Sequence, residues 1–266
     1  MSVSLPFNVT DKQIADFNRD GYLFVPGLFD AEEMKLLLEV GKGDKEKAKM
    51  VGAAKDTQGG ESKLWLTSEQ RLDIYNGFVH CHRMVDTMEN LLADEVYLYH
   101  YKMMVKEARV GGIWEWHQDY GYWYRNQCLY PDMGSCMIAV DKADRANGCL
   151  QVIRGSHKMG RVEHGTFGQQ TGADPARVEL ALKHLELVYC EMEPGTALFF
   201  HANTLHRSDA NKSDRPRWTL ICCYNTRNNP TDDLPGHPSY TPLEKWPDSR
   251  IKELGRKQAE SIAAGQ

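Results

Sequence analysis

Two histidines and an aspartate in this chain have the residue types and spacing of a metal-binding triad. His117 and Asp119 stand one residue apart at the end of an expected strand, and His206 stands at the end of another. Positions i and i+2 of a strand face the same side, so the imidazole and the carboxylate can converge. Two neutral imidazoles and one carboxylate leave adjacent sites open on an octahedral metal, as in iron(II) oxygenases. For the H-x-D pair alone, a histidine paired with a nearby aspartate is the alternative.

The segment that follows the triad contains a donor suited to a 2-oxo acid co-substrate. A 2-oxo acid that chelates iron has a distal carboxylate, which a planar guanidinium binds better than an ammonium. Arg217 opens a strand on which we expect Arg217, Thr219 and Ile221 to point inward. Arg215 has the same parity and is the rival candidate, but it precedes Pro216 and is therefore expected in the loop.

Further candidates lie on the strand expected after Glu95 and around the metal motif. His100, Lys102 and Met104 share one parity and could face a pocket, although the opposite parity is at least as apolar. Aromatic residues crowd the metal motif: Trp114, Trp116, Tyr120, Tyr122, Trp123 and Tyr124. We expect most of them to pack in the core, and Trp123 with one or two tyrosines to form a substrate wall.

The elements that position these residues are mainly short strands. From residue 95 onward, segments enriched in β-branched and aromatic residues alternate with turns such as Asn147-Gly148 and Pro194-Gly195. This pattern predicts an antiparallel sandwich or barrel. Before residue 95 we expect one helix over about 11–19, a second that begins after an N-cap at Asp30, and a third over 69–93. We expect residues 52–62 to form a mobile loop. Residues 159–186 predict a lid or a partly helical insertion, and the last ~35 residues predict surface turns and a terminal helix.

Composition favours one globular domain and excludes several functions. The 266 residues are 41% hydrophobic and 26% charged, with no evident linker. A net charge of -5 gives no footprint for nucleic acid, and no stretch approaches the ~20 apolar residues of a membrane span. The N-terminus has no basic patch followed by an apolar run, so we expect a cytoplasmic location. The seven cysteines are odd in number and form no C-x-x-C pair, which predicts reduced thiols.

The combined motifs resemble the phytanoyl-CoA dioxygenase superfamily from about Tyr97 to Thr226. The matching pieces are WHQD at 116–119, D-x-x-x-x-x-NGCLQVIRGSHK at 141–158, H-x-S-x-x-N-x-x-x-x-x-R at 206–217 and GYLFVPGLFDAEE at 21–33. The spacings of Trp123 from the first histidine, and of Ser208 and Arg217 from the second, are similar to those of the ectoine hydroxylase branch. The resemblance implies that Ser208 assists Arg217 at the distal carboxylate and that Trp123 lines the pocket. From their positions on the strands, we expect His100 and Thr219 as further co-substrate contacts.

The resemblance also implies a fold and an activity. The expected fold is mostly β with flanking helices, a double-stranded β-helix (jelly-roll or cupin-like) barrel with an N-terminal helical layer. The single domain 1–266 would comprise a helical part at about 1–94, a barrel core at 95–228 and a C-terminal extension at 229–266. The expected activity is hydroxylation of an unactivated C–H of a small polar or zwitterionic metabolite. Iron(II), 2-oxoglutarate and O2 would take part, succinate and CO2 would be released, and ascorbate would stimulate the reaction.

Two departures from the family pattern leave the substrate open. RGSH at 154–157 replaces a proline-containing motif, and residues 120–133 do not reproduce the ectoine hydroxylase signature. The halogenating relatives lack the metal carboxylate, so Asp119 favours hydroxylation. Two alternatives remain: a non-catalytic metabolite-binding barrel, and a zinc-dependent isomerase or lyase in which Arg217 would have no role. Either a monomer or a homo-oligomer is compatible with the sequence.

Overall fold

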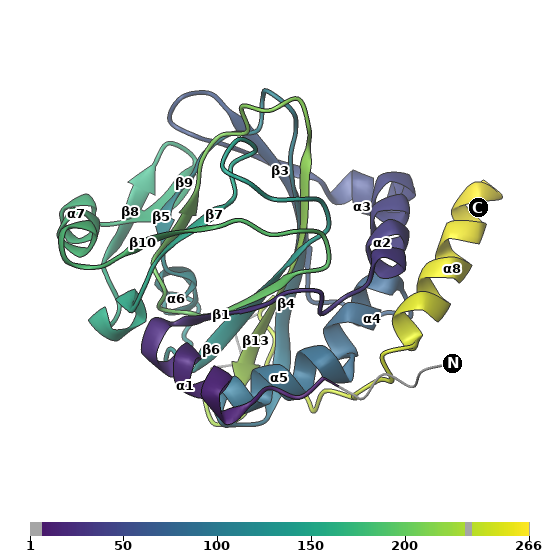
Figure 1. Cartoon of the computed structure of the whole chain (residues 1–266), viewed down its shortest axis with the longest axis horizontal. Coiled ribbons are helices and arrows are strands. Elements are labelled where there is room, and N and C mark those ends of the chain that lie inside the picture. The colour runs from purple at the N-terminus through teal and green to yellow at the C-terminus, as the bar shows by residue number, and fades with distance from the viewer. Residues whose placement is uncertain (1–6, 232–235, 266) are drawn as a thin grey trace.

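Two antiparallel sheets that face each other form the centre of the computed structural model, which describes residues 7–231 and 236–265 (Figure 1). The larger sheet has the order β1 (Tyr22–Val25), β11 (Ala197–His201), β6 (Met133–Ala139), β13 (Arg217–Thr226), β4 (Val96–Lys106), β3 (Glu61–Thr67) and β2 (Gly52–Lys55). The smaller sheet has the order β10 (Leu187–Cys190), β7 (Leu150–Ile153), β12 (His206–Ser208) and β5 (Trp114–His117). The prediction of an antiparallel β fold with flanking helices is confirmed. Within the described residues, the strands form separate sheets and not one closed barrel.

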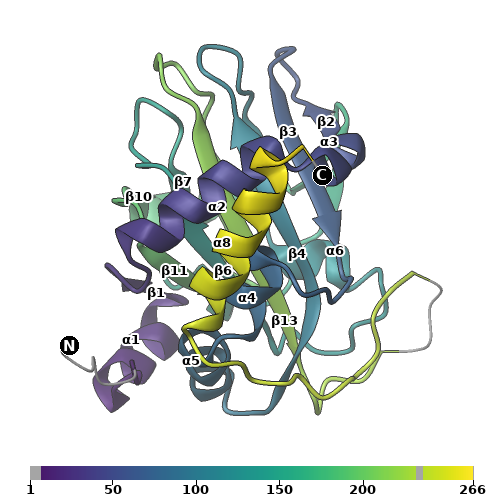
Figure 2. The same ribbon diagram turned by 90° about the vertical axis from the view of Figure 1, so that its right-hand side faces the viewer.

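Helices cover the outer face of the larger sheet (Figure 2). They are α1 (Asp11–Asp20), α2 (Ala31–Gly43), α3 (Lys45–Met50), α4 (Ile74–His80), α5 (His82–Leu92) and α8 (Arg250–Ala263). Asp30 caps α2 as expected, accepting hydrogen bonds from the amides of Glu32 and Glu33. Helix α8 packs against α2 and α4, so the C-terminal extension contributes to the layer that the sequence assigned to the N-terminal part.

Both faces of the larger sheet are buried at its centre, as strand β13 illustrates. Leu220, Cys222 and Tyr224 belong to the core beneath the helices. Ile221 and Cys223 alternate with them and belong to the core between the two sheets. The site therefore lies in an interior that is walled by sheet on two sides. The seven cysteines are free and buried, in agreement with the expected reduced thiols.

The prediction of a mobile loop at 52–62 is wrong, because this segment forms the β2–β3 hairpin. The carboxylate of Asp56 accepts hydrogen bonds from the amides of Gln58 and Gly60 and orders the polar turn. Strand β3 also pairs with β4 and buries Trp65 against Tyr101. Glycine and polar residues indicated a loop, but these tertiary partners stabilise a hairpin.

A second correction concerns Asp119, which begins the short helix α6 (Asp119–Trp123) and does not continue strand β5. The expected insertion at 159–186 is partly helical: it contains the hairpin of β8 (His164–Phe167) and β9 (Gln170–Ala173), followed by α7 (Pro175–His184). Among the described residues, none of the helices combines the length and the apolar character that a membrane crossing requires.

Candidate functional site

The three predicted metal-binding side chains meet between the two sheets. Strands β5 and β12 are paired so that His117 and His206 lie directly opposite each other. The Nε2 atoms of both histidines lie 3.9 Å from Oδ1 of Asp119, and the three ligand atoms lie within 4.8 Å of one another. All three residues are buried. The first turn of α6 thus brings the carboxylate to the point that the strand argument had assigned to it.

Backbone carbonyls hold both imidazoles in one orientation. Nδ1 of His117 lies 2.7 Å from the carbonyl oxygen of Glu115, and Nδ1 of His206 lies 2.9 Å from that of Thr204. A nitrogen that faces a carbonyl must carry the proton, so the lone pair of each ring is on Nε2. Metal-binding histidines are oriented in this way.

The charges of the triad also suit a divalent metal. Burial lowers the pKa of His117 well below its usual value and lowers that of His206, so both rings are neutral. Burial alone would raise the pKa of Asp119, but His206, Lys102, His117 and a hydrogen bond hold it at about 2. That hydrogen bond comes from Ser135 Oγ to Oδ2, at 2.7 Å, and leaves Oδ1 for a metal. No ligand would have to lose a proton when a metal binds.

The structure separates the two candidate arginines. Arg217 is buried, and its Nη1 donates a hydrogen bond to the carbonyl oxygen of Gly148. Its Nε has no partner among the described residues, and burial lowers its pKa to about 10. Arg215 is exposed and forms an ion pair of 2.6 Å with Asp144. Arg217 is therefore the arginine that faces the interior, as expected.

A cavity of about 20 Å³ extends from Arg217 to the triad. Ser208 lines it, in agreement with the expectation. Thr219 does not line it, but lies between Arg217 and Ile221 on the same face of β13, with a buried hydroxyl that has no partner in the described chain. An unpaired guanidinium nitrogen and an unpaired hydroxyl in the interior are what an absent carboxylate would satisfy.

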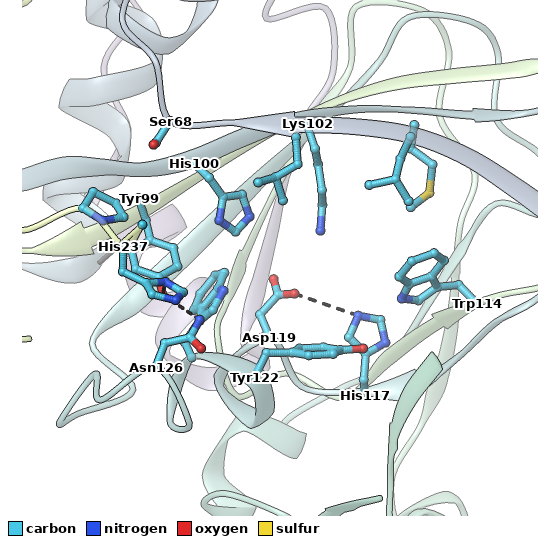
Figure 3. Close-up of a pocket in the computed structure, with 16 residues that line it drawn as sticks. Ser68, Tyr99, His100, Lys102, Trp114, His117, Asp119, Tyr122, Asn126 and His237 are labelled. Atoms are coloured by element: carbon cyan, nitrogen blue, oxygen red, sulfur yellow. Dashed lines mark hydrogen bonds and ion pairs between the residues drawn. The ribbon is translucent and has the colours of Figure 1, made fainter. Parts of the chain in front are cut away.

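A larger cavity, of about 320 Å³, adjoins the other side of the triad (Figure 3). His100, Lys102 and Met104 line it, so this parity of β4 is the inward one. Tyr99 lines it too, because the β4–β13 register shifts between residues 98 and 100 and leaves Tyr99 without a partner in β13. The remaining aromatic wall consists of Trp114, Tyr122 and Trp123. Among the aromatic residues near the motif, the prediction for Trp123 is thus supported by its position.

Several residues at the site were not singled out from the sequence. The fully buried amine of Lys106 donates hydrogen bonds of 2.6 Å to the carbonyls of Gly112 and Asp209, and so joins β4 to the segments beside β5 and β12. The inward parity of β4, continued by two residues, could have indicated it. Asn126 and His237 line the outer end of the larger cavity, where the sequence carries no pattern that would identify them.

Two polar residues near the motifs, Asn211 and His157, stabilise loops and do not line the cavities. Nδ2 of Asn211 donates hydrogen bonds to the carbonyls of Arg215 and Lys106, which fixes the turn before β13. Nε2 of His157 lies 3.2 Å from the carbonyl of Asn18, away from the triad.

Comparisons with known proteins agree with this geometry. The model of the family described as "Phytanoyl-CoA dioxygenase (PhyH)" matches residues 17–219. An L-proline trans-4-hydroxylase from Streptomyces griseoviridis is 30% identical over 60% of this chain, and the match covers 64% of that relative. An ectoine dioxygenase from Sphingopyxis alaskensis is 25% identical over 83% of this chain and 77% of its own. A crystal structure of EctD from S. alaskensis with 2-oxoglutarate and 5-hydroxyectoine has a TM-score of 0.76 and 22% identity, and covers 90% of this chain and 89% of that one.

Proposed function

The chain belongs to the phytanoyl-CoA dioxygenase family, and we propose that it is an iron(II)- and 2-oxoglutarate-dependent dioxygenase that hydroxylates a small metabolite. The observation that carries the proposal is the buried guanidinium of Arg217, which faces the triad through a narrow cavity and has an unpaired nitrogen among the described residues. A buried cation without a counterion is costly. A dicarboxylate that binds the metal at one end and Arg217 at the other would remove this cost. In a zinc-dependent isomerase the buried guanidinium of Arg217 would have no role.

The metal would be held by His117, Asp119 and His206. Their free Nε2 atoms and the free Oδ1 atom face one point, and their neutral and ionised forms are those that iron(II) needs. When bound, iron(II) with 2-oxoglutarate and O2 supplies the oxidation of an unactivated C–H bond, with release of succinate and CO2. Ascorbate would keep the metal reduced.

The protein's own residues bind and orient the reactants. Arg217 and Ser208 would hold the distal carboxylate, because both line the narrow cavity. Carbonyl groups prevent rotation of the two histidines, and Ser135 prevents rotation of Asp119. These contacts preorganise the site before the substrate arrives. The aromatic wall of the larger cavity would displace water from the face of the substrate that lies beside the triad.

The substrate is a small molecule bound in the larger cavity, and its polar character is proposed from the amine, imidazole and amide groups that line the cavity. The buried free cysteines favour a cytoplasmic location. We treat residues 1–266 as one domain, because α8 packs against helices of the N-terminal part.

The test measures metal content and succinate formation in purified protein supplied with iron(II), ascorbate and 2-oxoglutarate. The wild type should bind iron stoichiometrically and form succinate slowly without substrate, whereas His117→Ala and Asp119→Ala should lose both. His184→Ala is the matched control, because this histidine is exposed on α7. Succinate formation that survives both triad substitutions would overturn the ligand assignment. Metal binding without succinate formation under any condition would favour a non-catalytic barrel.

A further inference from the structure

The larger cavity has an unequal distribution of charge. Among the described residues that line it, Asp119 provides the only carboxylate, and Lys102 provides an amine. The carboxylate of Asp119 lies 3.9 Å from the neutral rings of the two histidines, and Lys102 forms no ion pair among the described residues. Figure 3 shows the amine in the middle of the cavity, above Asp119 and between His100 and Trp114.

In the loaded site Lys102 would have no acidic side chain of its own among the described residues, although it also lines the narrow cavity that leads to Arg217. This step rests on the proposed function. Asp119 and the metal-bound carboxylate of 2-oxoglutarate would neutralise iron(II), and Arg217 would neutralise the distal carboxylate. No acidic side chain of the described lining is then left for Lys102. Because Lys102 is only partly exposed and lies beside the buried triad, water screens its ammonium less than it would at the surface, so the ammonium acts on the charge of anything bound beside it.

The same inventory disfavours a positive charge on the substrate. An amino group bound in this cavity would lose its hydration and meet Lys102, with no carboxylate of the described lining to compensate it. The aromatic residues Trp114, Tyr122 and Trp123 could attract a cation, but that attraction would have to exceed the repulsion by Lys102. A carboxylate, in contrast, would form a charge-assisted hydrogen bond with Lys102.

The uncharged residues that line the cavity indicate the chemical character of the rest of the ligand. Leu64, Leu66 and Met104 face the aromatic wall and suit an apolar body. Nε2 of His100 is buried without a partner in the described chain, so a neutral polar group on the ligand can bond to it. Burial lowers the pKa of His100 to about 3, which keeps the ring uncharged. Asn126 and His237 offer further hydrogen bonds at the outer end (Figure 3).

We propose that the substrate is a small carboxylate with an apolar body and no amino group, and that Lys102 binds its carboxylate. The sequence led us to expect a polar or zwitterionic metabolite, and the proposal restricts the substrate to an anion. It also makes Lys102 the residue that determines the charge selectivity of the site.

The experiment measures binding by calorimetry, without oxygen, to protein loaded with iron(II) and 2-oxoglutarate. The probes are leucine, phenylalanine and proline, each as the zwitterion, the N-acetyl acid, the N-acetyl methyl ester and the methyl ester. They present one carbon skeleton as a zwitterion, an anion, a neutral molecule and a cation. For at least one skeleton the anion should bind about tenfold or more tighter than the other forms, because one charge-assisted hydrogen bond is gained. Equal or tighter binding of zwitterions or cations, or binding of none of the anions, would overturn the proposal.

Two variants assign the effect to the amine. Lys102→Met should remove the preference for the anion and weaken its binding by about tenfold, whereas Lys102→Arg should retain the preference. Both should still bind 2-oxoglutarate. A loss of 2-oxoglutarate binding in Lys102→Met would place the amine in the co-substrate site and overturn the inference. Failure of the wild type to bind 2-oxoglutarate would instead contradict the proposed function, so the two failures are distinguishable.

Discussion

The guanidinium of Arg217 donates a hydrogen bond to the carbonyl oxygen of Gly148, in the connection between β6 and β7. This contact fixes one end of a buried cation whose Nε has no partner among the described residues. Arg217 therefore has one nitrogen that is held by Gly148 and another that is free to bind a carboxylate.

We expect Arg217→Met to raise the KM for 2-oxoglutarate by roughly 10- to 100-fold, because charge-assisted hydrogen bonds contribute about 1.5–3 kcal/mol. The melting temperature of the protein without co-substrate should stay the same or rise, because the substitution removes an uncompensated buried charge. Arg215→Met is the matched control, and its exposed ion pair with Asp144 predicts a change in KM below about threefold. The larger effect in Arg215→Met would transfer the role to that residue.

Gly148→Ala tests whether the acceptor positions the arginine. Gly148 has a φ of +72°, and an added Cβ would lie 2.1 Å from the carbonyl oxygen of Asp209. The backbone of one segment must move, and Asp209 directly follows Ser208. We expect the KM for 2-oxoglutarate to rise by about tenfold with iron content unchanged. Gly165→Ala, whose Cβ would have its nearest neighbour at 4.0 Å, should leave both quantities as in the wild type. Equal KM values in the two variants would show that Gly148 does not position Arg217.

The sequence predicted local features of this site well and long-range contacts poorly. The dipeptide Asn147-Gly148 indicated a turn, and the turn is present, but its contact with Arg217 depends on how the segment before β13 docks. The pairing of His117 with His206 is also a long-range relationship, and only the combined family motifs indicated it. Tyr99 entered the cavity because of a bulge, which strand parity cannot predict.

The helical layer depends on a buried ion pair between Arg83 and Glu33. Nη2 of Arg83 lies 2.6 Å from Glu33, its Nε lies 3.0 Å from Asp248, and Glu33 is 2% exposed. Arg83→Met would leave a buried carboxylate without its cation, so we expect the free energy of unfolding to fall by about 3–5 kcal/mol in urea titrations. Lys12→Met, which breaks an exposed pair with Asp16, should cost less than about 0.5 kcal/mol. If both variants lost a similar amount of unfolding free energy, the burial of the Arg83–Glu33 pair would not explain its contribution to stability.

The pH dependence of stability should contain a contribution from His201, at the end of β11. Burial, with a smaller effect of His157, lowers the pKa of His201 to about 4. Nδ1 of this ring accepts a hydrogen bond of 3.1 Å from the amide of Asn203, which protonation would break. Between pH 6.5 and 4 the unfolded state therefore binds a proton that the folded state does not, so stability falls as the pH falls.

His201→Asn isolates this contribution, because the asparagine oxygen can accept the same amide hydrogen bond and does not titrate. Between pH 7 and pH 5, the wild type should lose roughly 1–2 kcal/mol more than the variant in its free energy of unfolding. The measurement is a series of urea titrations on both proteins in one set of buffers. The other histidines titrate in both proteins and cancel in the difference. Parallel pH profiles would show that His201 has an ordinary pKa in the folded state. A steeper profile for the variant would show that His201 stabilises the folded state as the pH falls, which is the opposite of the expected effect.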